Sequence, residues 1–281
     1  MFDISFGWIG VAIIVFRESL EAGLVSLIIL TYLVRINRRD LSKYVYSGIG
    51  LAILLSVILG SLISFVYSEL SDVGADLFEV VAGFIAVPVL TFMIIWMAKN
   101  AKKIRGELEE RLQVFISRNY LIGIMVLSLT TVAREGLETV LFLITFIGSS
   151  TFSTVIGSII GILLTLGSLW TINKGFTKIK LQSIFKYTSL LIIILAAGIL
   201  FKTVNEMVNL LADNGISLGV LGHLAYYLDI PEGSAFSDKG LIGGIFSAFT
   251  GYMTYSTWIG IIVYILYWVI ASILFYKTYV Q

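Results

Sequence analysis

The stretch VFRESLEAGL, residues 15–24, places Arg17, Glu18 and Glu21 inside an apolar segment that is long enough to cross a bilayer. Of the 281 residues, 58% are hydrophobic and only 13% are charged, and the mean hydropathy is +0.98. Even on a lenient insertion scale, a charged residue at the centre of a span costs about 2.5–3.5 kcal/mol before it is paired. Three charges in one span therefore require compensation by ion pairing, by water or by a bound ion.

Further apolar runs follow this segment, and together they predict an all-α polytopic membrane protein with seven transmembrane helices. The connector 99–118, with ELEERL at its middle, predicts a short amphipathic helix on the cytoplasmic side. The segment GLIGGIF, residues 240–246, fits either a short re-entrant piece or an early start of the last helix. We expect the seven helices near residues 6–34, 44–67, 77–98, 119–147, 153–173, 187–211 and 249–275.

The charges of the connections predict an orientation in the membrane. Of the 19 Lys and Arg residues, 15 lie in the odd-numbered connections or after the last helix. Because basic residues collect on the cytoplasmic side, this bias predicts an N-terminus outside and a C-terminus in the cytoplasm. The opposite connections hold Glu69, Asp72, Asp76, Asp213, Asp229, Glu232 and Asp238 against Lys239.

The charged motif occurs a second time in AREGLETVLF, residues 133–142, where Arg134, Glu135 and Glu138 have the same spacing 117 residues later. The tetrapeptide LGSL also occurs twice, at 59–62 and 166–169. Three helices followed by three helices predict two repeats of inverted topology. We therefore expect one membrane domain, residues 1–281, made of repeats at about 1–98 and 119–211 and an extra helix at about 249–275.

The spacing of the motif places its three charges on one helix face. At about 100° per residue, Glu21 falls between Arg17 and Glu18, and a pseudo-two-fold axis would bring the two motifs face to face. Four carboxylates and two guanidinium groups leave a formal charge of −2, which favours a bound cation. The alternative is that Arg and Glu pair only within each helix and serve packing. The predicted metal ligands are Glu18, Glu21, Glu135 and Glu138, with Arg17 and Arg134 as supporting residues.

The available side chains limit the metal and the chemistry. Carboxylates suit hard cations such as ferric iron, manganese, calcium or magnesium. The chain has no cysteine and one histidine, His223, so copper(I) and zinc are disfavoured. A di-iron carboxylate oxidase requires Glu-x-x-His pairs, which one histidine cannot supply. We therefore expect no enzyme, and a purely structural membrane protein would leave the duplicated charges unexplained.

The sequences RESLE and REGLE resemble the paired Arg-Glu-x-x-Glu motifs of the oxidase-dependent iron permeases, the membrane component of high-affinity iron uptake. The resemblance extends through LFEVVAGFIAV, LAAGILFKTVNEM and FTGYMTYSTWIGIIVYILYW, and so covers nearly the whole chain. It implies a multi-pass permease of the cell membrane that moves iron, ferric iron being the expected form, into the cytoplasm. Iron would be its substrate, with no cofactor, and the four motif glutamates would form its path.

Two further acids, Glu79 and Glu206, match acidic positions of the same family, and with Asp76 they are additional candidate metal ligands. Glu79 together with Glu69, Asp72 and Asp76 predicts an outer entrance that concentrates cations. The alternatives are that Glu79 is a helix N-terminal acid favoured by the dipole and that Lys202 neutralises Glu206. A permease for another hard or borderline cation, such as manganese or lead, is the rival function. Iron and membrane lipid are the expected partners, with a separate ferroxidase or extracytoplasmic iron-binding protein and without nucleic acid.

Overall fold

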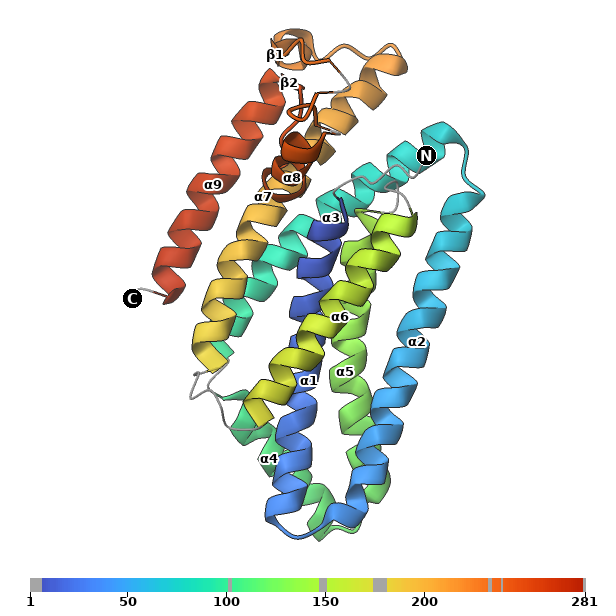
Figure 1. Ribbon diagram of the computed structural model, residues 1–281, viewed down its shortest axis with the longest axis vertical. Coiled ribbons are helices and arrows are strands. Elements are labelled where there is room, and N and C mark those ends of the chain that lie inside the picture. Colours follow the sequence, from blue (N-terminus) through green and yellow to red (C-terminus); the bar gives the residue numbers. More distant parts are fainter. Residues whose placement is uncertain are drawn as a thin grey trace.

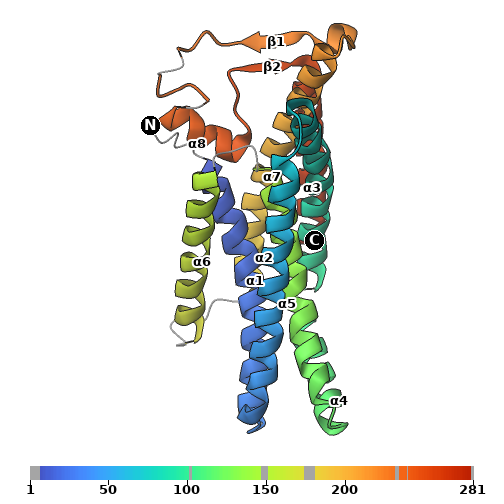
Figure 2. The ribbon, with the colours of Figure 1, turned by 90° about the vertical axis from the view of Figure 1, so that its right-hand side faces the viewer.

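The computed structural model describes residues 7–100, 103–146, 151–173, 181–231, 234–238 and 240–279. Within them the chain is mostly helical, with two short 3-10 turns, η1 (Arg39–Leu41) and η2 (Gly219–Gly222). Two short antiparallel strands, β1 (Leu224–Tyr227) and β2 (Tyr255–Thr257), lie at one end of the helices (Figures 1 and 2). The helices are α1 (Gly7–Arg35), α2 (Ser42–Ser68), α3 (Asp72–Asn100), α4 (Ile104–Ser117), α5 (Leu121–Ile144), α6 (Thr151–Asn173), α7 (Leu181–Asp213), α8 (Leu241–Thr250) and α9 (Trp258–Tyr279).

Five of the described helices are long and apolar enough to cross a membrane: α2, α3, α6, α7 and α9. The helices α1 and α5 are 29 and 24 residues long, and each carries the three charges of its Arg-Glu-x-x-Glu motif near its middle. Apolar side chains of α2 such as Ile53, Val57 and Ile58 are more than half exposed, as a helix that faces lipid requires. The protein is therefore a multi-pass membrane protein.

The long helices pack in pairs between the first and second parts of the chain. The helix α1 packs chiefly on α6, α2 on α5, and α3 on α7, while α1 and α5 also contact each other. The ribbon views show α1, α2, α5 and α6 side by side, with α9 packed on α7 (Figures 1 and 2). Each long helix of the first 100 residues thus has its main partner between residues 121 and 213.

Glycines allow these helices to approach closely. A Cβ at Gly48 of α2 would lie 2.4 Å from the carbonyl oxygen of Met125 in α5. A Cβ at Gly161 of α6 would lie 2.7 Å from the carbonyl oxygen of Ala12 in α1. Small residues at the contact let two backbones meet, which is how helices gain packing energy in lipid.

The last transmembrane helix predicted from the sequence begins later in the structure, as α9. The prediction was 249–275, but α8 ends at Thr250, Gly251 follows with a φ of 75°, and α9 begins only at Trp258. The segment GLIGGIF belongs to α8, a separate short helix rather than an early start of the last span. Asn205 of α7 explains the boundary, because its Oδ1 accepts hydrogen bonds from the Thr257 backbone N–H (2.9 Å) and hydroxyl (3.0 Å). A hydropathy profile does not reveal this extended link between α8 and α9.

The predicted amphipathic connector is the helix α4. Its Leu108 and Leu112 are buried in an apolar cluster with residues of α1, α2 and α5. Glu109 accepts hydrogen bonds from Arg105 (3.0 Å) and from Arg35 at the end of α1 (2.8 Å). These hydrogen bonds hold the pKa of the Glu109 carboxyl below its usual value. The connector is therefore docked against the bundle.

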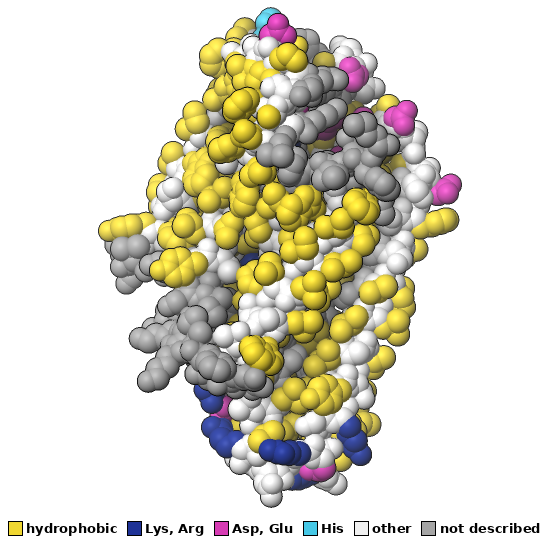
Figure 3. All heavy atoms as spheres, viewed as in Figure 1, with side chains coloured by type: hydrophobic (Ala, Val, Ile, Leu, Met, Phe, Trp, Pro, Cys, Tyr) yellow, Lys and Arg dark blue, Asp and Glu magenta, His cyan; other side chains and the backbone are white. Residues whose placement is uncertain are grey.

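Basic side chains gather at one end of the molecule, where they outnumber the acids on the face shown in Figure 3. On the face shown in Figure 3, Lys and Arg gather at the end that holds α4, whereas acids and the histidine lie mainly at the other end. Apolar side chains cover the region between the two ends on this face. Two residues of the predicted outer charge set, Glu232 and Lys239, lie outside the described residues.

The close approach at Gly48 generates a stability prediction. We expect Gly48→Ala to lower the free energy of unfolding by about 1–3 kcal/mol, because its methyl group would meet the backbone of α5. Thermal unfolding of the purified protein in detergent measures this change. The matched control is Gly50→Ala in the same helix, where a Cβ meets nothing within 4 Å. Equal melting temperatures for the two variants would contradict the packing described here.

Candidate metal centre

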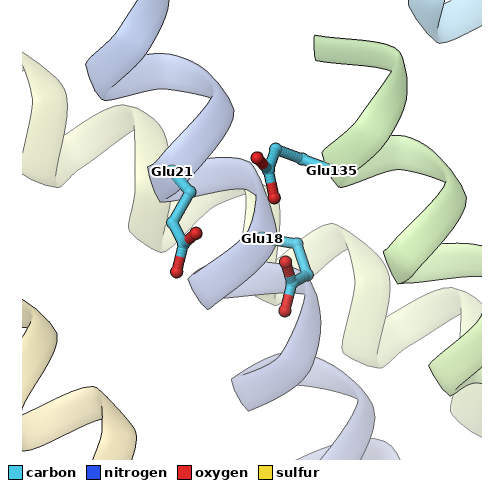
Figure 4. Close-up of side chains that lie close together, drawn as sticks. All are labelled: Glu18, Glu21 and Glu135. Carbon is cyan, nitrogen blue, oxygen red and sulfur yellow. The ribbon is translucent and has the colours of Figure 1, made fainter. Parts of the chain in front are cut away.

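Three glutamates from two helices meet in the interior of the bundle. Glu18 and Glu21 come from α1 and Glu135 comes from α5, and each offers one carboxylate oxygen within 4.8 Å of the others (Figure 4). All three side chains are buried. The i,i+3 spacing on α1 directs both of its glutamates towards α5, as the helical periodicity predicts.

Arg17 holds the two glutamates of its own helix. Its Nη1 lies 2.5 Å from Glu18 Oε1, and its Nη2 lies 2.6 Å from Glu21 Oε1. Nη1 also donates to Met93 Sδ of α3 at 3.3 Å. The Arg17 side chain is only 2% exposed. It therefore lies where it can orient both carboxylates, and its supporting role at a metal site stays a prediction.

Arg134, in the second motif, has a different environment. Its Nε lies 3.1 Å from Glu138 Oε1 and 3.3 Å from Glu135 Oε1, yet the side chain is 41% exposed. Its guanidinium carbon lies 4.6 Å from the centre of the Trp96 ring, which places the cation over the face of the indole. Two motifs of identical spacing thus have unlike surroundings.

The carboxylates keep unused acceptor atoms. The Oε2 atoms of Glu18, Glu21, Glu135 and Glu138 are buried, and none accepts a hydrogen bond from a described residue. A buried carboxylate oxygen without a partner is costly. Oxygens of this kind are the ligands that hard cations prefer. The site can therefore bind a metal ion through oxygens that the arginines do not occupy.

Glu138 lies at the edge of the site rather than within it. It pairs with Arg134 and is 18% exposed, whereas the close group contains only Glu18, Glu21 and Glu135 among the described residues. The structure thus brings three of the four predicted ligands together and leaves the fourth beside the second arginine. Met93 and Trp96, which contact the two arginines, were not predicted, because two such residues in an apolar helix carry no distinctive signal.

The predicted outer acids form a separate group near the other end of the bundle. Glu79 accepts a hydrogen bond from the Tyr67 hydroxyl at 2.5 Å, and Glu206 is close enough to Asp76 and Glu79 for their charges to act on it. Lys202 forms no ion pair with Glu206 in the described part of the chain. The three predicted acids are therefore near one another but apart from the central glutamates.

Similarity to known proteins identifies the family of this chain. Residues 8–278 match the model of the family described as "Iron permease FTR1 family". The chain belongs to this iron permease family. Its membership, together with the spanning helices, makes it a multi-pass membrane protein of a family of iron permeases.

Two of the three relatives described here cover nearly the full length of the permease. An uncharacterized protein of Archaeoglobus fulgidus is 33% identical over 270 residues, which span 96% of this chain and 95% of the relative. The ferrous iron permease EfeU of Yersinia pestis is 30% identical over 94% of this chain and 92% of its own. An EfeU of Escherichia coli is 32% identical over 66% of this chain and 69% of its own. No solved structure matches the chain.

The unequal surroundings of the two arginines generate a second prediction. We expect Arg17→Gln to lower the free energy of unfolding by about 3–5 kcal/mol, because it leaves two buried carboxylates unpaired. The matched variant Arg134→Gln should cost only about 1–2 kcal/mol, because the Arg134 side chain is 41% exposed and Glu138 is also partly exposed. Denaturant or thermal unfolding in detergent checks both values. A larger loss in Arg134→Gln would contradict the burial that separates the two residues.

Proposed function

We propose that this permease moves iron across the cell membrane into the cytoplasm through the carboxylates of its two Arg-Glu-x-x-Glu motifs. Glu18, Glu21 and Glu135 form the central site, and Glu138 follows beside Arg134. The observation that carries the proposal is the meeting of three buried carboxylates from two helices, each with one oxygen within 4.8 Å of the others. Each also keeps an oxygen that accepts no hydrogen bond from a described residue. A purely structural ion pair would not leave those oxygens without donors.

The fold proposed for this function is two inverted repeats, α1–α3 and α5–α7, followed by α9, with seven spans and the N-terminus outside. The packing supports it. If the two repeats are exchanged, α1 takes the place of α5, α2 that of α6 and α3 that of α7. The α1–α6 contact then becomes the α5–α2 contact, and the α3–α7 contact is unchanged. The basic end that holds α4 supports a cytoplasmic assignment for that end.

The two sides of the glutamates differ as alternating access requires. On the side of the N-terminus, Ile14 and Phe142 are fully buried in one apolar cluster. On the side of α4, Val25 and Thr131 line a cavity of about 250 Å³ that reaches Glu21 and Glu135. The spacing of 117 residues relates Ile14 to Thr131 and Val25 to Phe142. Rocking of the repeats would exchange these environments, which closes the cavity and opens the outer side.

Ferric iron is the proposed substrate, because carboxylates are hard ligands. Two observations favour ferrous iron as a second candidate. The EfeU relatives are named ferrous iron permeases, and a divalent ion balances the formal charge of −2 on the double motif. In the proposed route, a separate ferroxidase or extracytoplasmic iron-binding protein delivers iron to the outer acids Asp76, Glu79 and Glu206. The central glutamates then receive it.

Uptake of radioactive iron into iron-starved cells tests the central site. We expect Glu21→Gln and Glu135→Gln each to reduce uptake at least about tenfold, because each loses a charged ligand that the metal requires. Asp40→Asn, which changes an exposed acid in the η1 turn, is the control and should transport normally. Undiminished uptake in both motif variants, at equal protein levels, would refute transport through these carboxylates.

The choice of ion is tested in proteoliposomes that contain the purified permease. Uptake is compared for ferric iron kept soluble by citrate and for ferrous iron kept reduced by ascorbate. We expect faster entry of ferric iron, and only weak competition by an excess of manganese or lead, because a trivalent ion is attracted to the carboxylates more strongly than a divalent one. Faster entry of ferrous iron selects the second candidate. Full inhibition by manganese would instead favour the rival manganese permease.

A further inference from the structure

A cavity of about 250 Å³ joins the buried glutamates to the connector helix. Glu21 and Glu135 lie at its inner end, and Glu107 and Arg111 of α4 also line it. Glu107 and Arg111 are exposed, so the cavity continues to the surface at the basic end of the molecule. An ion that leaves the central site on this side would therefore pass the connector helix.

The acids of α4 differ in what they contact. Glu109 is held by Arg35 and Arg105, and so fastens α4 to the end of α1. Glu107 forms no ion pair with any described residue, and it lines the cavity that holds Glu21 and Glu135. Glu110 is exposed on the same helix and does not line this cavity. Glu107 is thus an acid of α4 that lines the cavity and makes no ion pair with a described residue. Because α4 is packed against the bundle, the position of Glu107 is fixed beside the path of an ion that leaves the central site.

The walls of the cavity explain why a carboxylate is useful there. Val25, Met97 and Leu127 make part of the lining apolar, and an ion that separates from its counter-charges beside apolar walls loses much of its stabilisation. Thr131 adds one polar group, whose hydroxyl donates to the Leu127 carbonyl at 2.6 Å and keeps its oxygen lone pairs towards other partners. Between the buried glutamates and water, Glu107 is the only acid among the described lining residues.

We propose that Glu107 is a release site. Its carboxylate binds the metal cation weakly after the cation leaves Glu21 and Glu135, and the cation then enters the cytoplasm. Arg111, one turn later on the same helix, keeps the binding weak because its positive charge reduces the negative potential at Glu107. Conduction requires such a balance, because a site must attract the ion and yet let it leave. This assignment rests on the proposed function of the double motif and extends it to a residue outside the motifs.

Iron uptake by Glu107→Gln tests the release site. We expect the maximal rate to fall at least about fivefold, the effect of losing one charge interaction of moderate strength, while the external iron concentration for half-maximal uptake stays unchanged. The matched control is Glu110→Gln, which removes the same charge from the same helix outside the cavity and should transport at the normal rate. Equal maximal rates for the two variants would overturn the role of Glu107, as would a loss in both.

The route itself is tested without any iron. The chain has no cysteine, so a single introduced cysteine is a clean reporter. In membrane vesicles of both orientations, a membrane-impermeant maleimide should label Thr131→Cys from the α4 side and leave the adjacent Val132→Cys, which is buried, unlabelled. Labelling of Thr131→Cys only from the opposite side would overturn the route. Because labelling needs no transport, it separates failure of this inference from failure of the double-motif proposal.

Discussion

The buried ion pairs of Arg17 with Glu18 and Glu21 are the constraint around which the bundle is arranged. Three charges in the middle of a helix are too costly to face lipid, so α1 must turn this face inwards and let other helices cover it. Met93 of α3 accepts a further hydrogen bond from Arg17, and Glu135 of α5 completes the carboxylate group. Electrostatics therefore sets the rotation of α1, and the close packing of α6 on its other side follows.

Close packing fixes the relative positions of the helices in lipid more precisely than the charges alone would. Between apolar helices in a bilayer there is no hydrophobic driving force, so close contact has to hold them together. The glycines at positions 48 and 161 bring α2 onto α5 and α6 onto α1 at backbone distance. These two contacts exchange under the proposed symmetry. The same contacts that stabilise the bundle also place the two charged motifs opposite one another.

The sequence predicted a helical multi-pass membrane protein, and the details that it missed have identifiable causes. Spans follow from hydropathy and the central acids from their spacing, because both are local properties of a helix. The start of α9 was placed nine residues too early, because a hydropathy average does not register the hydrogen bonds that Thr257 makes with Asn205. Met93 and Trp96 were missed because their roles depend on where α3 packs. The displacement of Glu138 from the close group arises from a tertiary asymmetry that the identical spacing of the two motifs does not indicate.

That asymmetry has a functional meaning if the repeats exchange roles during transport. Arg17 is enclosed and binds two carboxylates, whereas the side chain of Arg134 is partly exposed and lies over the Trp96 ring at the side of the cavity. An arginine that lies over an indole face retains its charge but exerts a weaker hold on its glutamates than an enclosed one. The second motif is then the looser half of the site in this conformation. Because Glu135 belongs to that half and also lines the cavity, it is the ligand from which a cation would depart towards Glu107.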